Sequence, residues 1–282
     1  MKKIHFKTVV IVMAALFVIQ SYACGQTIKS AENYLKELPH HLKLNYHGNY
    51  QKYKMTAVYI NKDLSGNFMN KTGVTGEYTC GLEGGRVKWN NVYLANSDSL
   101  KKAFPKGFRQ DYIEGMEYIP TSKMMETTSF EKFPTTPDGV FTKNLIWDMM
   151  ALEMGAWNYF DTLQLNQTFT VPGAQGKFAM ADIGDYEHSS IQICWTGLSM
   201  ANGKICAIIE FKALNNKIDL NMPGIKSKGS EIYWGNILVS LEDKQIEHAV
   251  MYSNTLQDLK IAVLPQNLII NTMREVNVEK IP

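Results

Sequence analysis

The segment from Thr142 to Leu163 is the one long stretch of this chain that predicts a helix, and it constrains the fold most. At 100° per residue its polar side chains scatter around the helical wheel, and apolar side chains fill the remaining positions on every side. A helix that is apolar nearly all round is normally buried. We therefore expect a sheet that wraps around residues 142–163, with Thr142 as the N-terminal cap of the helix.

Short runs of β-branched and aromatic residues, separated by turn residues, occupy most of the remaining chain. Two hairpins are predicted after residue 167, with turns at Asn202-Gly203 and at Glu242–Lys244. Their strands are apolar on both faces, which indicates that both faces are covered. The sequence thus predicts a mainly β, α+β fold: a strongly curved antiparallel sheet or half-barrel packed around one central apolar helix.

The chain divides into a predicted signal peptide and one β-rich domain. Within the domain we expect N-terminal strands, an irregular crossing loop rich in proline and threonine, the buried helix, and an antiparallel meander. The boundaries are residues 1–23 for the signal peptide and 24–282 for the domain, with parts at 24–119, 120–141, 142–163 and 167–282.

The N-terminus has the pattern of a secretory signal. Three lysines precede the apolar run Val9–Ile19, and the small residues Ser21 and Ala23 follow it. The run is shorter than the roughly 20 residues that a membrane-spanning helix needs. The sequence therefore predicts export, to a periplasmic, outer-membrane-anchored or extracellular location.

Cys24 leaves two forms of export open. Residues 21–24 resemble the lipobox of bacterial lipoproteins in the small residue Ala23 and the cysteine after it, although Ser21 stands where leucine is usual. The resemblance implies lipidation of Cys24, which would tether the protein to a membrane. Plain export without an anchor is the alternative.

Cys194 and Cys206 flank the first predicted turn and are a candidate disulfide, since an exported protein meets conditions that permit one. The alternative is that both are small buried hydrophobic residues. No Cys/His spacing is typical of a zinc site, so we expect no metal and no cofactor. The formal net charge is +2 without a block of like charge, which argues against a nucleic-acid partner.

One acidic cluster contains a histidine and is the only candidate for chemistry. Asp182, Asp185, Glu187 and His188 could supply an acid–base pair, whereas the alternative is a polar turn between strands. The chain has no GxSxG, SxxK, P-loop or GxGxxG motif. We therefore favour a non-catalytic role, with a secreted hydrolase or carbohydrate-acting enzyme as the alternative.

The leading interpretation is an exported protein that binds an apolar ligand or lipid, or an envelope protein partner. It rests on the apolar helix and on methionines that adapt to varied apolar shapes. A further alternative is a structural component of an envelope complex, which requires a large exposed apolar patch. The candidate ligand-binding residues are Met149, Met150, Met154, Trp157, Trp195 and Trp234.

Overall fold

The computed structural model describes residues 49–282, which belong to one compact unit. The predicted signal peptide and Cys24 lie outside the described residues. The unit consists of one open sheet of thirteen strands and one α-helix, α2 (Pro137–Glu153), the only α-helix within residues 49–282. Within this range no helix is long and apolar enough to cross a membrane.

The strands pair antiparallel in the order β4-β3-β2-β1-β13-β12-β11-β10-β8-β7, with β5 beside β3, β9 beside β10 and β6 beside β9. Strand β13 pairs along its length with β1, so the last strand joins the N-terminal strands to the C-terminal meander. The strands are β1 (Gln51–Asp63), β2 (Phe68–Leu82), β3 (Arg86–Ser97), β4 (Phe108–Arg109), β5 (Glu117–Tyr118), β6 (Thr168–Thr170), β7 (Gly176–Ala179), β8 (Gly184–His188), β9 (Ile191–Ala201), β10 (Lys204–Met222), β11 (Ile225–Ser240), β12 (Ile246–Ile261) and β13 (Leu268–Ile281).

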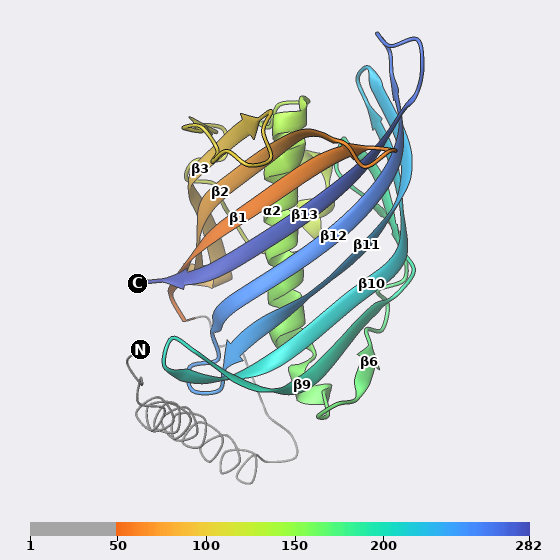
Figure 1. Cartoon of the computed structure of the whole chain (residues 1–282). Helices are drawn as coiled ribbons and strands as arrows, with labels where there is room; N and C mark the ends of the chain where they lie inside the picture. Colours follow the sequence, from red (N-terminus) through yellow and green to blue (C-terminus); the bar gives the residue numbers. More distant parts are fainter. Residues whose placement is uncertain (1–48) are drawn as a thin grey trace, which may run out of the picture. The chain divides into compact units, whose positions relative to one another are not determined.

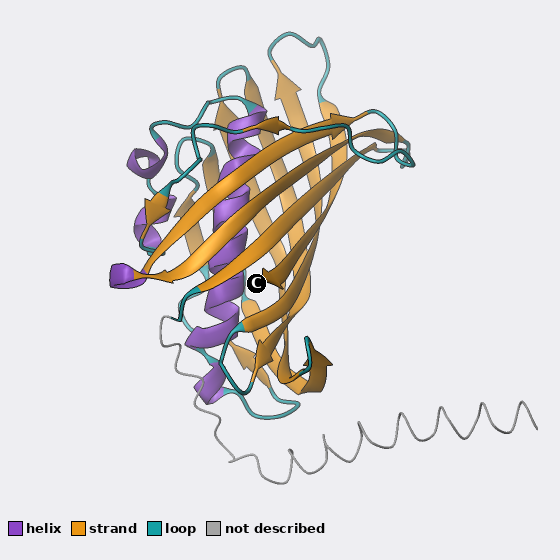
Figure 2. Cartoon of the chain, turned by 90° about the vertical axis from the view of Figure 1, so that its left-hand side faces the viewer, coloured by secondary structure: helices purple, strands orange, loops and turns teal. Residues whose placement is uncertain are grey.

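The sheet curves around α2, and the core lies between them (Figure 1; Figure 2). Side chains alternate between the two faces of each strand, and on β1 the inward-facing Met55 and Ala57 are fully buried. On α2, Leu145 and Met149 are fully buried as well. The predicted fold class, a curved antiparallel sheet around one apolar helix, is confirmed.

Helix α2 begins five residues earlier than the sequence predicted. Proline lacks a backbone N–H, but the first helical turn does not need one, so Pro137 is tolerated at the start of the helix. Thr142 is therefore not the N-terminal cap. It lies inside the helix, where its hydroxyl donates to the carbonyls of Asp138 and Gly139 at 3.1 Å.

The helix also ends before Leu163. After Glu153 the chain forms one π-helical turn, η4 (Met154–Asn158), and then a short 3-10 turn, η5 (Phe160–Thr162). Gly155 lies in η4 against β11, because a Cβ there would come within 3.1 Å of Ile237 Cδ1. The glycine thus permits close packing of this turn on the sheet.

Both predicted hairpins are present. Asn202 and Gly203 have φ values of 51° and 76°, the positive angles that a tight two-residue hairpin turn requires. The turn between β11 and β12 contains Lys244 at φ 63°. The crossing segment between β5 and α2 contains two short 3-10 turns, η2 (Ser122–Met125) and η3 (Thr127–Phe130).

Candidate functional site

A buried ionic cluster links the helix to the middle of the sheet. Arg274 on β13 lies 3.1 Å from the carboxylate of Asp148 on α2 and 3.3 Å from that of Glu231 on β11. The three side chains are only 11%, 9% and 9% exposed. Two carboxylates and one guanidinium give this cluster an excess of negative charge in a region that water hardly reaches.

Burial sets the protonation properties of this cluster. It raises the pKa of Asp148 to about 6, although the charge of Arg274 opposes the shift. Burial also works against the charge of Arg274, but the carboxylates of Asp148 and Glu231 outweigh it and raise the pKa of the guanidinium. Arg274 therefore stays charged, and Asp148 titrates near neutrality.

Hydroxyl groups complete the cluster. Tyr186 on β8 donates to Glu231 at 2.6 Å, and Thr255 on β12 donates to the same carboxylate at 3.3 Å. Arg274 Nε donates to the hydroxyl of Ser253 at 3.2 Å. Strand register places a polar row across the inner face here, formed by Asn216, Glu231, Thr255, Thr272, Asn61 and Asn70 on six neighbouring strands.

Beyond the polar row, towards the far ends of the long strands, apolar side chains return to the inner face of β10, β12 and β13, with Gly229, Ser227 and Gln257 between them. These apolar residues share the face of Glu231 and Arg274, and all are half-buried, whereas most of the alternate residues beside them are exposed. We call this set the apolar end surface: Ile218, Leu220, Leu259, Ile261, Leu268 and Ile270.

Two pockets open at this end of the sheet. A strand-end pocket of about 730 Å³ is lined by charged and small residues from β7, β8 and the ends of β10 to β12, including Leu220 and Ser227. Ser227 is buried, and its hydroxyl has no hydrogen-bond partner within the described chain. An amide pocket of about 850 Å³ is lined by Asn61, Asn70, Thr72, Asn96, Ser97, Asp98, Lys102, Ala103, Pro105, Pro137, Asp138 and Phe141.

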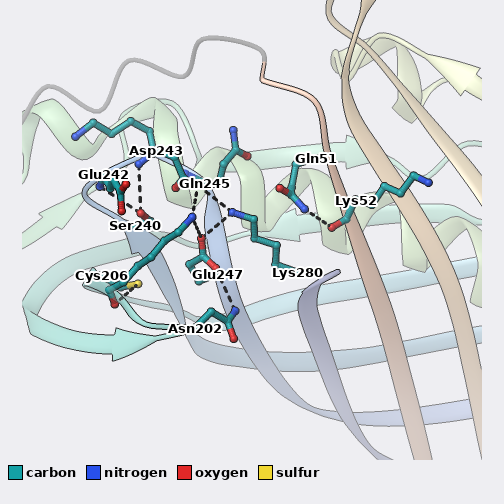
Figure 3. Close-up of polar contacts among 12 residues, drawn as sticks. Gln51, Lys52, Asn202, Cys206, Ser240, Glu242, Asp243, Gln245, Glu247 and Lys280 are labelled. Atoms are coloured by element: carbon teal, nitrogen blue, oxygen red, sulfur yellow. Dashed lines mark hydrogen bonds and ion pairs between the residues drawn. The ribbon is translucent and has the colours of Figure 1, made fainter. Parts of the chain in front are cut away.

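A second ionic cluster lies at the opposite ends of the strands (Figure 3). Glu247, whose side chain is 1% exposed, is 2.7 Å from Lys280 Nζ and 3.2 Å from Lys204 Nζ. Asp243 binds the same two ammonium groups. Burial alone would raise the pKa of Asp243, but the hydrogen bonds from the two lysines prevail and lower it. The two positive and two negative charges balance, and the ion pairs tie β13 and β10 to the β11–β12 turn.

The predicted ligand-binding residues do not converge on one site. Met149 and Trp195 are core residues, and Trp157 donates its indole N–H to the carbonyl of Lys244 at 2.8 Å. Met150 and Met154 are half-buried on the helix and its π turn. Trp234 lies on the outer face of β11, 43% exposed. The helix methionines thus serve mainly to fill the core.

The structure does not bring Asp182, Asp185, Glu187 and His188 together as one acid–base cluster. Asp185 and Glu187 pair with Lys177 and Lys217 on the outer face of β8. Successive strand residues face opposite ways, so His188 points to the inner face, among aromatic rings.

Asp182 forms an ion pair with the buried Lys143 of α2, and it lines the strand-end pocket together with Asp185. At His188, which lies among aromatic rings, burial lowers the pKa of the imidazole. No group of three or more His, Cys, Asp or Glu side chains in the described range is arranged to hold a metal ion.

The proposed disulfide is absent, because register separates the two cysteines. Cys206 pairs with Ser199 and Cys194 with Glu210, so the thiols lie at different levels of the β9–β10 ladder. Both are free thiols. Burial raises the pKa of Cys206 to about 11, which keeps this thiol protonated and unreactive.

The outer face of β11, β12 and β13 carries a band of exposed apolar side chains. Trp234 and Tyr252 are direct cross-strand partners, and their rings stack at 6.0 Å between centroids. Isolated exposed hydrophobic residues are normal, but contiguous ones mark interaction surfaces. The outer band comprises Ile232, Trp234, Tyr252, Leu256, Ile269 and Met273.

Sequence alone did not identify Glu231 and Arg274. Both stand at core-facing positions of strands whose alternate residues are otherwise mostly apolar or aromatic, such as Tyr233 beside Glu231 and Val276 beside Arg274. A charged residue in the inward series of a strand is the signal that could have found them, because such a charge needs a buried partner.

No protein-family model matches the chain, and no curated protein sequence matches it. Among solved structures it is similar to lipovitellin, described under lipid-protein interactions, with a TM-score of 0.36 and 13% identity over 84% of this chain and 26% of that one. The chain therefore spans about a quarter of lipovitellin. A DUF1329 family protein from Desulfovibrio piger has a TM-score of 0.16 and 7% identity, over 82% and 86% of the two chains. Likenesses this distant carry no argument about function.

Proposed function

We propose that the protein is an exported, non-catalytic binding protein that holds an amphipathic, lipid-like ligand on the inner face of its open sheet. The observation that supports this most is the apolar end surface, where inner side chains of β10, β12 and β13 are apolar and only half-buried. The polar row and the two pockets border that surface. An amphipathic ligand fits this arrangement, with its apolar chain on the apolar end surface and its polar head against the bordering polar groups. Export is supported by the pattern of residues 1–24.

Dependence on chain length is the expected signature of such a site. Each buried methylene contributes about 0.8 kcal/mol, so affinity should rise roughly fourfold for each carbon that reaches the apolar end surface. Decyl, dodecyl and tetradecyl phosphocholine, titrated below their micelle-forming concentrations against a fluorescent displacement probe, provide the series.

Neighbouring residues on β13 supply a matched pair of variants. Leu268 belongs to the apolar end surface, whereas Ile269 points to the outer face. We expect Leu268→Asp to weaken dodecyl phosphocholine binding by about tenfold or more, because it places a charge among the apolar chains. Ile269→Asp should leave the affinity nearly unchanged. Equal affinities in the two variants, or no dependence on chain length, would contradict the proposal.

A second candidate function is docking of an envelope protein partner through the outer band, which exposes six large apolar side chains on one face. Trp234 and Tyr252 are the aromatic members of the outer band, and Trp and Tyr are typical of the residues that contribute most binding energy at an interface. We expect a photo-crosslinking residue at Trp234 to capture one defined partner in cells, and a crosslinker at Lys54, on the same face of β1, to capture none. Identical crosslinking patterns from both positions would rule out a specific docking site.

A further inference from the structure

We infer that the amide pocket binds a neutral, polyhydroxylated group, such as the sugar headgroup of an amphipathic ligand. This inference rests on the proposed function, because it assigns a headgroup to the ligand whose chain lies on the apolar end surface.

Hydrogen bonds hold the pocket's amides in fixed orientations. Asn61 Nδ2 donates to Asn70 Oδ1 at 2.8 Å, and Thr72 Oγ1 donates to Asn96 Oδ1 at 2.7 Å. These bonds occupy the oxygen ends of Asn70 and Asn96. No described residue accepts a hydrogen bond from Nδ2 of either side chain, so both NH2 groups remain available as donors.

The charge of the lining disfavours an anionic headgroup. Asp98 and Asp138 carry negative charge, and Lys102 is the one positively charged residue of the lining. A phosphate or carboxylate would therefore meet a surplus of negative charge, without the cluster of cationic donors that such groups usually require. Hydroxyl groups have no such need, because each donates and accepts and can pair with amides and carboxylates alike.

Apolar residues occupy part of the same lining. Phe141 packs on Tyr59 with ring centroids 4.7 Å apart, and Pro105 and Pro137 add further apolar surface. A sugar ring has polar edges and faces of C–H groups, so a lining that mixes amides with an aromatic ring matches it. The volume of about 850 Å³ lies in the range of small-molecule sites.

The pocket adjoins the apolar end surface directly. Asn61 lines the pocket and pairs with Thr272 on β13, and the Thr272 hydroxyl donates to the side-chain Oδ1 of Asn61 at 2.7 Å. Ile270 is the next residue of β13 on the same face, about 7 Å further along the strand. A headgroup in the pocket would thus place the attached chain at Ile270.

The test compares two detergents with the same chain. Dodecyl maltoside and dodecyl phosphocholine, with free maltose as a third probe, are titrated below micelle-forming concentrations against the purified protein by calorimetry. We expect dodecyl maltoside to bind about tenfold more tightly than dodecyl phosphocholine. We also expect Asn96→Ala and Asn70→Ala, both at exposed positions, to reduce that preference without changing the affinity for dodecyl phosphocholine.

Asn90→Ala is the control, because Asn90 lies on β3 with Asn96 but does not line the pocket and should leave the preference intact. Equal affinities for the two detergents, or a preference that survives both asparagine variants, would overturn the inference and leave the proposed function standing. Binding of maltose that depends on Asn96 but gains nothing from the dodecyl chain would support the pocket and overturn the proposed function. Absence of binding by all three probes would overturn both.

Discussion

Replacement of Arg274 by methionine is expected to lower the free energy of unfolding by about 3–5 kcal/mol at pH 7, the cost typical of breaking a buried ion pair. The variant retains the length of the side chain but leaves the carboxylates of Asp148 and Glu231 close together in a buried region. Their mutual repulsion and the loss of solvation are then uncompensated. Denaturant unfolding of the wild type and the variant measures the difference.

The pH dependence separates charge from packing. Burial raises the pKa of Asp148 to about 6, so this carboxylate takes up a proton as the pH falls, and the penalty for losing Arg274 should shrink between pH 7 and pH 4. A triple variant, with Asp148→Asn and Glu231→Gln added to Arg274→Met, removes all three charges and should recover most of the loss. An equal loss at both pH values would show that Arg274 acts through packing alone.

Arg86 is the matched control for Arg274. It is a surface arginine, 56% exposed, and lies 3.5 Å from Glu117. Exposed pairs contribute little, so Arg86→Met should change the free energy of unfolding by no more than about 1 kcal/mol. A loss as large as that of Arg274→Met would mean that arginine replacement in general, and not the buried cluster, destabilises the protein.

The fold could be predicted because its main signals are local in the sequence. An apolar surface on every side of residues 142–163 required burial, and Asn202-Gly203 specified a hairpin turn whose dihedral angles the structure contains. The helix boundary was wrong because Pro137 belonged to a proline-rich stretch that looked irregular. Whether such a proline starts a helix or ends a loop depends on tertiary packing that local sequence does not encode.

The site was harder to predict because it depends on which face of each strand is inward. On β11, Tyr233 and Trp234 are both aromatic, and the sequence does not show that the first is buried and the second exposed. The separation of His188 from Asp185 and Glu187 follows from the alternation of side chains along a strand, so it could have been predicted from the sequence. The pairing of Arg274 with Asp148 joins residues 126 positions apart, and it depends on the docking of α2 against β13.

Glu153 is expected to make the stability of the protein fall as the pH rises. It is a buried carboxyl group on the last turn of α2, and the hydroxyl of Tyr78 donates to it at 2.7 Å. Burial raises its pKa from 4.5 to about 7, and the hydrogen bond from Tyr78 only partly opposes the shift. Because the folded-state pKa is above the unfolded value, its contribution is fully present below pH 4.5 and is lost as the pH rises through 7.

The shift is large enough to measure. Each pKa unit corresponds to about 1.36 kcal/mol, so the stabilisation that is lost as the pH rises amounts to about 3 kcal/mol. Glu153→Gln keeps the shape of the protonated acid and does not titrate. We therefore expect the variant to match the wild type near pH 4.5 and to exceed it in stability by up to about 3 kcal/mol at pH 8, measured by denaturant unfolding across that range.

Comparison of the two proteins isolates Glu153 from the other buried acid. Asp148, whose pKa burial raises to about 6, titrates in both proteins, so its contribution cancels in the difference. Glu275→Gln, at an exposed position on β13, is the control for replacing a carboxylate by an amide and should change the free energy of unfolding by no more than about 0.5 kcal/mol. If the wild type and Glu153→Gln instead give parallel curves from pH 4.5 to pH 8, the carboxyl is ionised throughout and has found a compensating partner. Tyr78→Phe would then test the hydroxyl, because loss of this donor should raise the pKa of Glu153 further and move the fall in stability to higher pH.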